Sequence, residues 1–409
     1  MFKAKTVQEQ YTISENDRLR ILIVGAGIAG ITAAQMLRND GYHPVLIERN
    51  RNETHPGYML ALMPMVDTVL DDLGIRNKYR DHSVAFSRYG LHKHDGELLR
   101  EDSMAAILNR FGEYRGIARG ELLEVLTSAG CAVAFHTIVT EIKETAEAVM
   151  ATFKTGEAIY QLPFDLIIIA DGIHSHTRRL VLGKQAVDMV DTHWGGWVVW
   201  APADDAMDLG EELWGDGFFY GVYPVKDHLG VFLGGNIRDT TAGPKQFVDR
   251  IRGKLKHIDA RMESCLHAVA YAEEPFFWEL NDCRCPRWTF GKVLLLGDAA
   301  AGFLPTAGIG AGMAMESAWV LTRMLRYADK QHIAQLLQAY ENAQRPRVEA
   351  AQGNSRQLAR MMFRQSKLWA ILREWIMRLV SIEMALKPIQ KLLANQPDPD
   401  HLAQQALKK

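Results

Sequence analysis

The sequence of 409 residues has few cysteines, no long apolar run and no excess of one charge. Four cysteines are too few for the disulfide framework of a secreted protein of this size, so we interpret them as reduced thiols. Cys283 and Cys285 are spaced more closely than zinc ligands usually are, and we predict no metal site. Residues 1–20 lack the apolar core of a signal peptide, and no apolar run approaches the roughly 18 residues that cross a bilayer. We therefore expect a cytoplasmic protein.

Charge and composition narrow the class of function. The 47 basic and 49 acidic residues nearly balance. The formal net charge of −2 gives no basic field, so we predict no nucleic-acid partner. Hydrophobic residues make up 48% of the chain, which is enough for two or more packed units. The expected partner is a small-molecule substrate, and we expect a monomer or a homodimer.

What the sequence does contain is a glycine turn, ILIVGAGIAG, at residues 21–30. Gly25 permits a sharp turn from strand to helix, Gly27 lets the backbone approach a pyrophosphate, and Gly30 lets the helix pack closely on the strand. The pyrophosphate would lie against the positive N-terminal end of that helix. This pattern predicts a dinucleotide site.

A second apolar run, at residues 44–47, ends at Glu48, which lies 18 residues after Gly30. Strand, turn, helix, strand and acid therefore follow one another within about 30 residues, as a dinucleotide fold requires. The Glu48 carboxylate can accept both ribose hydroxyls and would repel a 2′-phosphate, which favours FAD or NAD over NADP. The glycine turn and Glu48 alone do not distinguish an FAD site from an NAD site.

Two further apolar runs, at residues 164–172 and 291–300, have the form of parallel strands covered on both faces. Between them, residues 190–290 alternate aromatic, glycine and polar residues, which predicts an antiparallel sheet. One face of this sheet could form an apolar substrate pocket, although at least half of its aromatic residues are expected in the core. These residues are Trp197, Trp200, Trp214, Phe218, Phe219, Tyr220 and Tyr223.

Three separated stretches resemble the class A flavoprotein monooxygenases, the p-hydroxybenzoate hydroxylase-like family. They are the glycine turn with Glu48 and Arg49, the segment ADGIHSHTRR at 170–179, and the segment GDAAAGFLPTAGIGAGMAMESA at 297–318. The sequence departs from the family pattern at Ala301, Gly312 and Ser317, where the family commonly has His, Asn and Asp. These departures leave the hydroxylase subgroup undefined.

The resemblance implies an FAD site assembled from all three stretches. Asp298 would meet a hydroxyl of the ribityl chain, and the helix after Gly310 would direct its N-terminus at the flavin ring and stabilise negative charge there. The implied FAD-binding residues are Gly25, Gly27, Ile28, Ala29, Gly30, Glu48, Arg49, Arg119, Asp171, Gly172, Gly297, Asp298, Pro305, Gly308, Gly310 and Ala311.

The resemblance also implies an enzyme. It would use NADH or NADPH as a transient electron donor and O2 as co-substrate to hydroxylate an aromatic or polycyclic small molecule through a flavin C4a-hydroperoxide. Tyr223 and His228 are the nearest candidate acid–base groups, and no catalytic residue is assigned. A prenyl-lipid type reductase, a flavin-dependent halogenase and a protein without turnover remain alternatives.

The fold class expected from these patterns is α/β. A discontinuous Rossmann-like FAD-binding domain would comprise residues 19–75, 110–189 and 291–340, and an antiparallel-sheet substrate domain residues 76–109 and 190–290. Residues 1–18 would form a flexible N-terminal extension, and residues 341–409 a C-terminal helical region.

The C-terminal region carries basic and apolar residues at helical spacing. The expected apolar stripe comprises Met361, Met362, Leu368, Ile371, Leu372, Trp375 and Leu379. We favour a helix that folds back on the FAD-binding domain. The alternatives are a partner helix and a peripheral membrane contact through the C-terminal helices.

Overall fold

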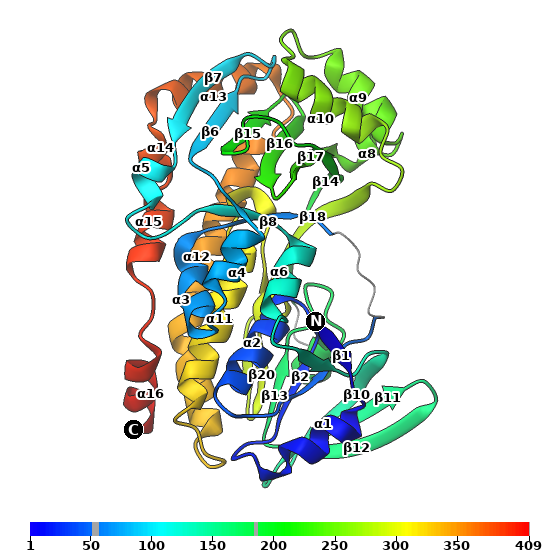
Figure 1. Cartoon of the computed structure of the whole chain (residues 1–409), viewed down its shortest axis with the longest axis vertical. Helices are drawn as coiled ribbons and strands as arrows, with labels where there is room; N and C mark the ends of the chain where they lie inside the picture. Colours follow the sequence, from blue (N-terminus) through cyan, green and yellow to red (C-terminus); the bar gives the residue numbers. More distant parts are fainter. Residues whose placement is uncertain (51–56, 184–186, 409) are drawn as a thin grey trace.

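The computed structural model describes residues 1–50, 57–183 and 187–408, and Figure 1 shows the arrangement of their helices and strands. In this view a predominantly parallel sheet lies below and a larger sheet above, with long helices running beside both. The two sheets are built from alternating segments of the chain, so neither is a continuous stretch of sequence. The chain is a mixed α/β protein.

The lower sheet has the strand order β19-β20-β13-β2-β3. Its four parallel strands are buried on both faces, which explains why the sequence shows unbroken apolar runs there. β19 is an antiparallel edge strand. The strands are β2 (Ile21–Val24), β3 (Val45–Ile47), β13 (Leu166–Ile169), β19 (Thr289–Phe290) and β20 (Val293–Leu295).

Long helices cover this sheet. α2 (Ile28–Asn39) follows β2 and packs against α11 (Gly310–Leu325), which in turn packs against α12 (Ile333–Met362). The fully buried Glu316 of α11 pairs with Arg347 of α12 at 2.7 Å. Since an unpaired buried charge is costly, this ion pair fixes how the two helices face one another.

The N-terminal residues are ordered, so the expectation of a flexible extension over residues 1–18 is corrected. β1 (Phe2–Ala4) pairs in parallel with β9 (Cys131–Val133), and α1 (Val7–Ile13) begins at a Thr6 capping box. The reason lies in buried contacts that a polar composition conceals. The side chain of Gln10 both donates to and accepts from the backbone of Leu46 in β3.

The upper sheet has eight strands in the order β21-β18-β14-β17-β16-β15-β6-β7. Its neighbours are antiparallel except for β15 and β6, which are parallel. β6, β7 and β21 come from outside residues 190–290. The strands are β6 (Arg88–His92), β7 (Leu98–Ser103), β14 (Asp188–Pro202), β15 (Leu209–Trp214), β16 (Phe218–Val225), β17 (His228–Asn236), β18 (Phe276–Arg284) and β21 (Ala301–Gly302).

Part of the segment expected to be a sheet is helical instead. α8 (Ile237–Thr240), α9 (Pro244–Arg252) and α10 (Ala260–Ala270) interrupt residues 190–290. Proline at the start of α9 and the Asp259 side chain that accepts from the Met262 N–H at the start of α10 are both helix-start signals. Both helix-start signals are present in the sequence, but the aromatic pattern around them favours strands.

Alternation along the strands gives the upper sheet two apolar faces. The outer face, which includes Trp197, Phe218 and Tyr220, packs against α9 and α10. The inner face, which includes Trp214 and Phe219, packs against Tyr58, Leu304 and the end of α12. The inner face therefore looks toward the lower sheet and its loops.

Smaller elements complete the fold. No helix of the described residues has both the length and the apolar character that a membrane span requires. The remaining elements are β4 (Met59–Leu62), β5 (Val84–Ala85), β8 (Arg115–Ala118), β10 (Thr137–Glu144), β11 (Val149–Thr155), β12 (Ala158–Phe164), α3 (Asp67–Asp72), α4 (Arg76–Asp81), α5 (Ala105–Leu108), α6 (Arg119–Leu126), α7 (Thr177–Leu182), α13 (Lys367–Leu379), α14 (Ile382–Ala385), α15 (Lys387–Ala394) and α16 (Pro399–Leu407).

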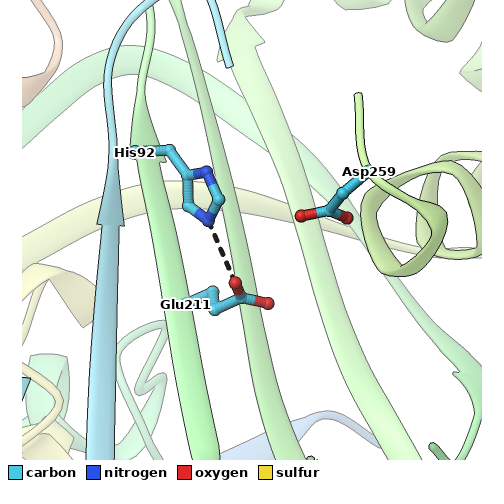
Figure 2. A group of neighbouring side chains, drawn as sticks. All are labelled: His92, Glu211 and Asp259. Atoms are coloured by element: carbon cyan, nitrogen blue, oxygen red, sulfur yellow. Dashed lines mark hydrogen bonds and ion pairs between the residues drawn. The ribbon is translucent and has the colours of Figure 1, made fainter. Parts of the chain in front are cut away.

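His92, Glu211 and Asp259 lie close together where α10 begins, near enough to hold a metal ion by distance (Figure 2). The charges of His92 and Glu211 are already matched by protein groups, and Asp259 Oδ1 accepts from the Met262 N–H at 2.7 Å. His92 Nε2 lies 3.0 Å from one Glu211 oxygen, and the other Glu211 oxygen lies 3.0 Å from Arg261 Nε. His92 Nδ1 also faces the Gly96 carbonyl. We interpret the group as an ionic network that attaches α10 to the sheet.

This network predicts a pH-dependent stability. Burial opposes protonation of His92, but the hydrogen bonds to Glu211 and the Gly96 carbonyl prevail and raise its pKa. A histidine with a raised pKa stabilises the fold below its unfolded pKa of about 6.5, and this contribution is lost as pH rises through the folded pKa.

We therefore expect wild type to exceed a His92→Gln variant in Tm by several degrees near pH 5.5, and the difference to shrink toward pH 9. Thermal unfolding across this range measures it. His228→Gln, which changes an exposed histidine of the same sheet, should show no such trend. A His92→Gln difference that is constant with pH would contradict the network.

Candidate functional site

The glycine turn after β2 is sterically fixed by its neighbours. Gly25 has φ +105°, and a Cβ there would lie 2.5 Å from the Ala170 carbonyl oxygen at the end of β13. A Cβ on Gly30 would lie 2.0 Å from the Gly25 carbonyl oxygen. Because a real Cβ cannot approach so closely, both positions require glycine for the fold itself.

Gly27, by contrast, faces open space. It is the N-cap of α2, its backbone is extended, and a Cβ there would meet no described atom within 4 Å. The first turn of a helix, here from Ile28 through Ala29 and Gly30, leaves N–H groups without intrahelical acceptors and carries a partial positive charge. The space beside Gly27 is thus suited to a phosphate group.

Glu48 follows β3 directly and connects it to the glycine turn. One carboxylate oxygen accepts from the Ala26 N–H at 2.9 Å, and the other accepts from the Asn50 N–H at 2.9 Å. A carboxylate has about four acceptor sites, so Glu48 retains capacity for ribose hydroxyls. Arg49 is the next residue after Glu48, and its side chain is exposed.

The segment after β13 has two parts with different roles. Asp171 Oδ2 accepts from the Thr177 N–H at 3.2 Å, while Oδ1 is buried and has no hydrogen-bond partner among the described residues. Gly172 follows with φ +86°. Further on, the buried Arg178 donates to the Ala299 carbonyl at 3.0 Å and so joins this segment to the turn after β20.

The turn after β20 packs on the first turn of α2. Gly297 has φ +60°, and a Cβ there would lie 2.7 Å from Ala29 Cβ. Asp298 is solvent-exposed, yet it lies among many protein atoms, whose desolvating effect raises the pKa of its carboxyl to about 6. A position at the floor of a cleft accounts for both observations, since a cleft admits solvent but is walled by protein.

The chain then leads from Pro305 through a single helical turn to Gly308, which has φ +62°. Gly310 is the first residue of α11, and Ala311 follows it. A Cβ on Gly312 would lie 2.8 Å from Met65 Sδ, which explains a glycine where the resembled family commonly has Asn. A Cβ on Gly297 would also lie 3.7 Å from Ala314 Cβ, so the N-terminal parts of α2 and α11 both border the turn after β20.

Arg119 reaches this group through Tyr58. Arg119 begins α6, and its N–H donates to the Tyr58 carbonyl at 2.9 Å. Burial raises the pKa of the Tyr58 phenol, the nearby Arg119 lowers it, and Asp298 raises it further. The Tyr58 side chain therefore lies near two predicted site residues, Arg119 and Asp298. Its ring centroid is 4.6 Å from that of Trp278, on the inner face of the upper sheet.

The aromatic residues predicted for the substrate pocket divide between the two faces. Trp197, Phe218 and Tyr220 belong to the outer core, where Trp197 contacts Phe247 of α9. Trp214, Phe219 and Tyr223 lie on the inner face by alternation, and so does Trp200. Trp200 and Phe276 line a cavity of about 390 Å³, but His267 and Ala268 of α10 line it too, so this cavity is not confined to the inner face.

The inner face carries one cluster that the sequence did not reveal. The carboxylate of Glu212 accepts from Tyr89 Oη at 2.7 Å, from Trp214 Nε1 at 2.8 Å and from Tyr223 Oη. Burial raises the pKa of Tyr89 and Tyr223 well above the usual range, and Glu212 adds to the effect. The other predicted acid–base candidate, His228, is exposed at the end of a hairpin.

This cluster lies close to the Pro305–Gly308 turn. Burial, and then the negative charge of Glu212, raise the pKa of Tyr114, so Tyr114 is near the cluster. Its hydroxyl oxygen would lie 4.0 Å from a Cβ on Gly308. The alternation E-x-W in β15 is the signal that could have located Glu212, because it places a carboxylate on the same face as an inward tryptophan.

A family model described as an FAD binding domain matches residues 18–355. The chain belongs to this family.

Individual relatives agree with the family. The chain is 26% identical over 363 residues to a flavin-dependent monooxygenase from an unknown prokaryotic organism, covering 82% of this chain and 87% of the relative. It is 27% identical over 358 residues to 3-amino-4-hydroxybenzoate 2-monooxygenase PtmB3 of Streptomyces platensis, covering 84% and 88%.

Solved structures show the same fold at lower identity. Klebsiella pneumoniae HpxO complexed with FAD and uric acid matches with a TM-score of 0.81 at 21% identity, over 94% of this chain and 99% of HpxO. A salicylate hydroxylase substrate complex matches with a TM-score of 0.69 at 20% identity, over 93% and 98%.

These findings confirm three predictions: the resemblance to class A flavoprotein monooxygenases, an oxidoreductase, and FAD as cofactor. The residues present also fit that cofactor. The open space at Gly27 suits a phosphate, the unpartnered Asp171 oxygen suits a hydrogen-bond donor, and the solvent-reached Asp298 carboxyl suits a hydroxyl.

The contrast between Gly27 and its neighbours predicts a selective loss of cofactor. A Gly27→Val variant should fold, because its side chain meets no described atom, but should lose most of its flavin absorbance because the valine fills the phosphate space. The measurement is the ratio of visible to protein absorbance after purification, with circular dichroism to verify folding.

Gly353→Val is the matched control. It also adds a side chain where no described atom lies within 4 Å, but within α12, and it should remain yellow. A folded Gly27→Val protein that retains its flavin would refute the assignment of the phosphate site.

Proposed function

We propose that this protein is an FAD-dependent monooxygenase that uses NADH or NADPH and O2 to hydroxylate an aromatic or polycyclic small molecule. One observation carries the proposal. Three segments far apart in the sequence, ending at Gly25, Asp171 and Asp298, meet at the same edge of the lower sheet, and the inner face of the upper sheet looks toward them. A cytoplasmic location is part of the same proposal.

The lower sheet would be the core of a discontinuous, Rossmann-like FAD-binding domain formed by residues 19–75, 110–189 and 291–340. The parallel order β20-β13-β2-β3 supports this, since ligands bind at the carboxyl ends of such strands. The upper sheet would be the core of a substrate domain formed by residues 76–109 and 190–290, and residues 341–409 would form the C-terminal helical region.

The residues that would hold FAD have distinct tasks. The N-terminus of α2 would hold the pyrophosphate, Glu48 the ribose hydroxyls, and Asp298 a hydroxyl of the ribityl chain. Arg119 would balance phosphate charge. The N-terminus of α11 would stabilise negative charge on the ring. The full set proposed is Gly25, Gly27, Ile28, Ala29, Gly30, Glu48, Arg49, Arg119, Asp171, Gly172, Gly297, Asp298, Pro305, Gly308, Gly310 and Ala311.

When bound, the flavin supplies the redox and oxygen chemistry. The chain's own residues would hold the substrate against the inner face, where Trp214 and Phe219 offer apolar ring contacts and exclude water. Glu212 would handle the proton of a phenolic substrate. Because Tyr223 donates to Glu212, it can pass its own proton to the carboxylate as it accepts one from the substrate hydroxyl.

Glu212 is well placed for this role because few charged side chains share the inner face. Arg100 and Asp102 of the edge strand β7 lie on the same side and pair with one another at 2.7 Å. Over the inner-face positions of Gly210–Trp214, Phe219–Tyr223, Gly230–Gly234, Trp194–Trp200 and Phe276–Leu280, all of which are described, Glu212 is the one charged side chain. Tyr223 donates its O–H to Glu212, so this phenol would be the group through which a substrate proton reaches the carboxylate.

The comparisons do not favour the two alternative enzymes. The string nearest to the Trp-x-Trp-x-Ile-Pro segment of tryptophan halogenases, Trp197 to Trp200, has the wrong spacing. Its two tryptophans lie on opposite faces of β14, and Trp197 packs in the outer core. A prenyl-lipid reductase consumes no O2, and neither does a binding protein without turnover. Oxygen uptake therefore distinguishes these functions from the proposed one.

The activity test follows from this distinction. Purified yellow protein should oxidise NADH or NADPH faster in the presence of a suitable ring compound and consume O2 as it does so. The names of the relatives suggest a first panel of aminohydroxybenzoates, salicylate and urate, extended with phenols and polycyclic compounds. Substrate reduction without O2 consumption would replace the monooxygenase with a reductase.

Glu212→Gln tests the proton path with a compound that this panel identifies. The variant should retain FAD and bind the compound, but its turnover at saturating substrate should fall about 100-fold or more, as for the loss of a general base. Glu279→Gln, an exposed glutamate of the same sheet, should turn over normally. Normal turnover of Glu212→Gln would contradict the proton path and show that Glu212 is only a structural hydrogen-bond acceptor.

A further inference from the structure

α13 exposes a continuous apolar stripe. Leu368, Leu372, Trp375 and Leu379 are 81%, 51%, 62% and 83% exposed, and their spacing places them on one side of the helix. Ile371 and Ile376 lie at the margins of the stripe and are also exposed. Single exposed apolar residues are ordinary, but a contiguous row on one helix marks an interaction surface.

The opposite side of α13 is attached to the protein. Arg373 is buried and donates to the carbonyls of Trp214 and Met361, and Arg100 of β7 donates to the Met377 carbonyl at 2.8 Å. Glu374 accepts from the backbone and side chain of His94. The helix is thus held by polar groups and by Met377, which packs against the inner-face core. Of the expected stripe, Met362 is buried in that core, whereas Leu368, Leu372, Trp375 and Leu379 are exposed, so the expected fold-back of these four residues onto the FAD-binding domain is corrected.

The sequence around the stripe is rich in positive charge. Residues 364–391 contain six basic and two acidic residues, in a chain with a formal net charge of −2. One of the acids is the Glu374 that pairs with His94, and one of the bases is the buried Arg373. The exposed basic residues are Arg364, Lys367, Arg378, Lys387 and Lys391.

We propose that α13 lies in the headgroup layer of a membrane that contains anionic lipids, with Leu368, Leu372, Trp375 and Leu379 inserted. An apolar face with a tryptophan and a basic margin is the pattern of a helix that lies in the membrane interface. A second copy of this chain fits the surface less well. Two apposed copies would bring their five exposed cations together, whereas an anionic lipid surface neutralises them.

Vesicle flotation with the flavin-loaded full chain tests the proposal. Wild type should float with vesicles of phosphatidylcholine and phosphatidylglycerol, float several-fold less with phosphatidylcholine alone, and dissociate in high salt. A Leu372→Glu, Trp375→Glu variant should lose most of its flotation and keep its visible flavin spectrum, since neither side chain is packed inside the fold.

The matched control is Ile159→Glu, which adds charge at a 68% exposed isoleucine of β12, and it should float as wild type does. Wild type that floats with none of the vesicles overturns the proposal. So does flotation of the double variant at the wild-type level. A wild-type dimer in light scattering that the double variant converts to monomer, without vesicle binding, would assign the stripe to a second copy.

Discussion

The close approach of three turns at one edge of the lower sheet is the constraint on which the site depends. The turn after β2 lies against the end of β13, because Gly25 has no side chain to hold the Ala170 carbonyl away. The turn after β20 lies against α2, because Gly297 leaves room for the Ala29 methyl group. Arg178 joins the second and third turns through the Ala299 carbonyl. Small residues thus bring the chain close, and one buried guanidinium holds it there.

The two faces of the upper sheet carry side chains with different roles. The outer face is attached to α10 by apolar packing and the ionic network of His92, Glu211 and Arg261, while the inner face is apolar around Glu212. The two glutamates are adjacent in β15 and point in opposite directions, since successive strand residues face opposite sides. Glu211 attaches α10 to the sheet, and its neighbour Glu212 accepts hydrogen bonds on the inner face. A one-residue slip of β15 would exchange these roles.

The sequence predicted the parts of the fold whose signal is local. The apolar runs at 21–24 and 166–169 are strands, and the glycine spacing placed the turn between β2 and α2, because backbone geometry there admits few residues. It did not predict the order of residues 1–16, which depends on contacts of Gln10 with a strand more than 30 residues away. It could not locate Glu212 either, because its partners Tyr89 and Tyr223 come from two different strands. The stripe on α13 was found but assigned to packing, because nothing local indicates that a buried arginine attaches the other side.

The unpartnered oxygen of Asp171 has a consequence for how the protein matures. A buried polar atom without a partner among the described residues costs about 1–3 kcal/mol, and Asp298, in the turn after β20, adds a carboxyl whose pKa is raised by burial among protein atoms. A ligand that donates to both carboxylates removes these costs, and its binding energy adds to the stability of the folded chain. Newly synthesised chains that bind FAD would then be more stable than chains that do not. Riboflavin starvation would therefore lower the amount of the protein as well as its activity.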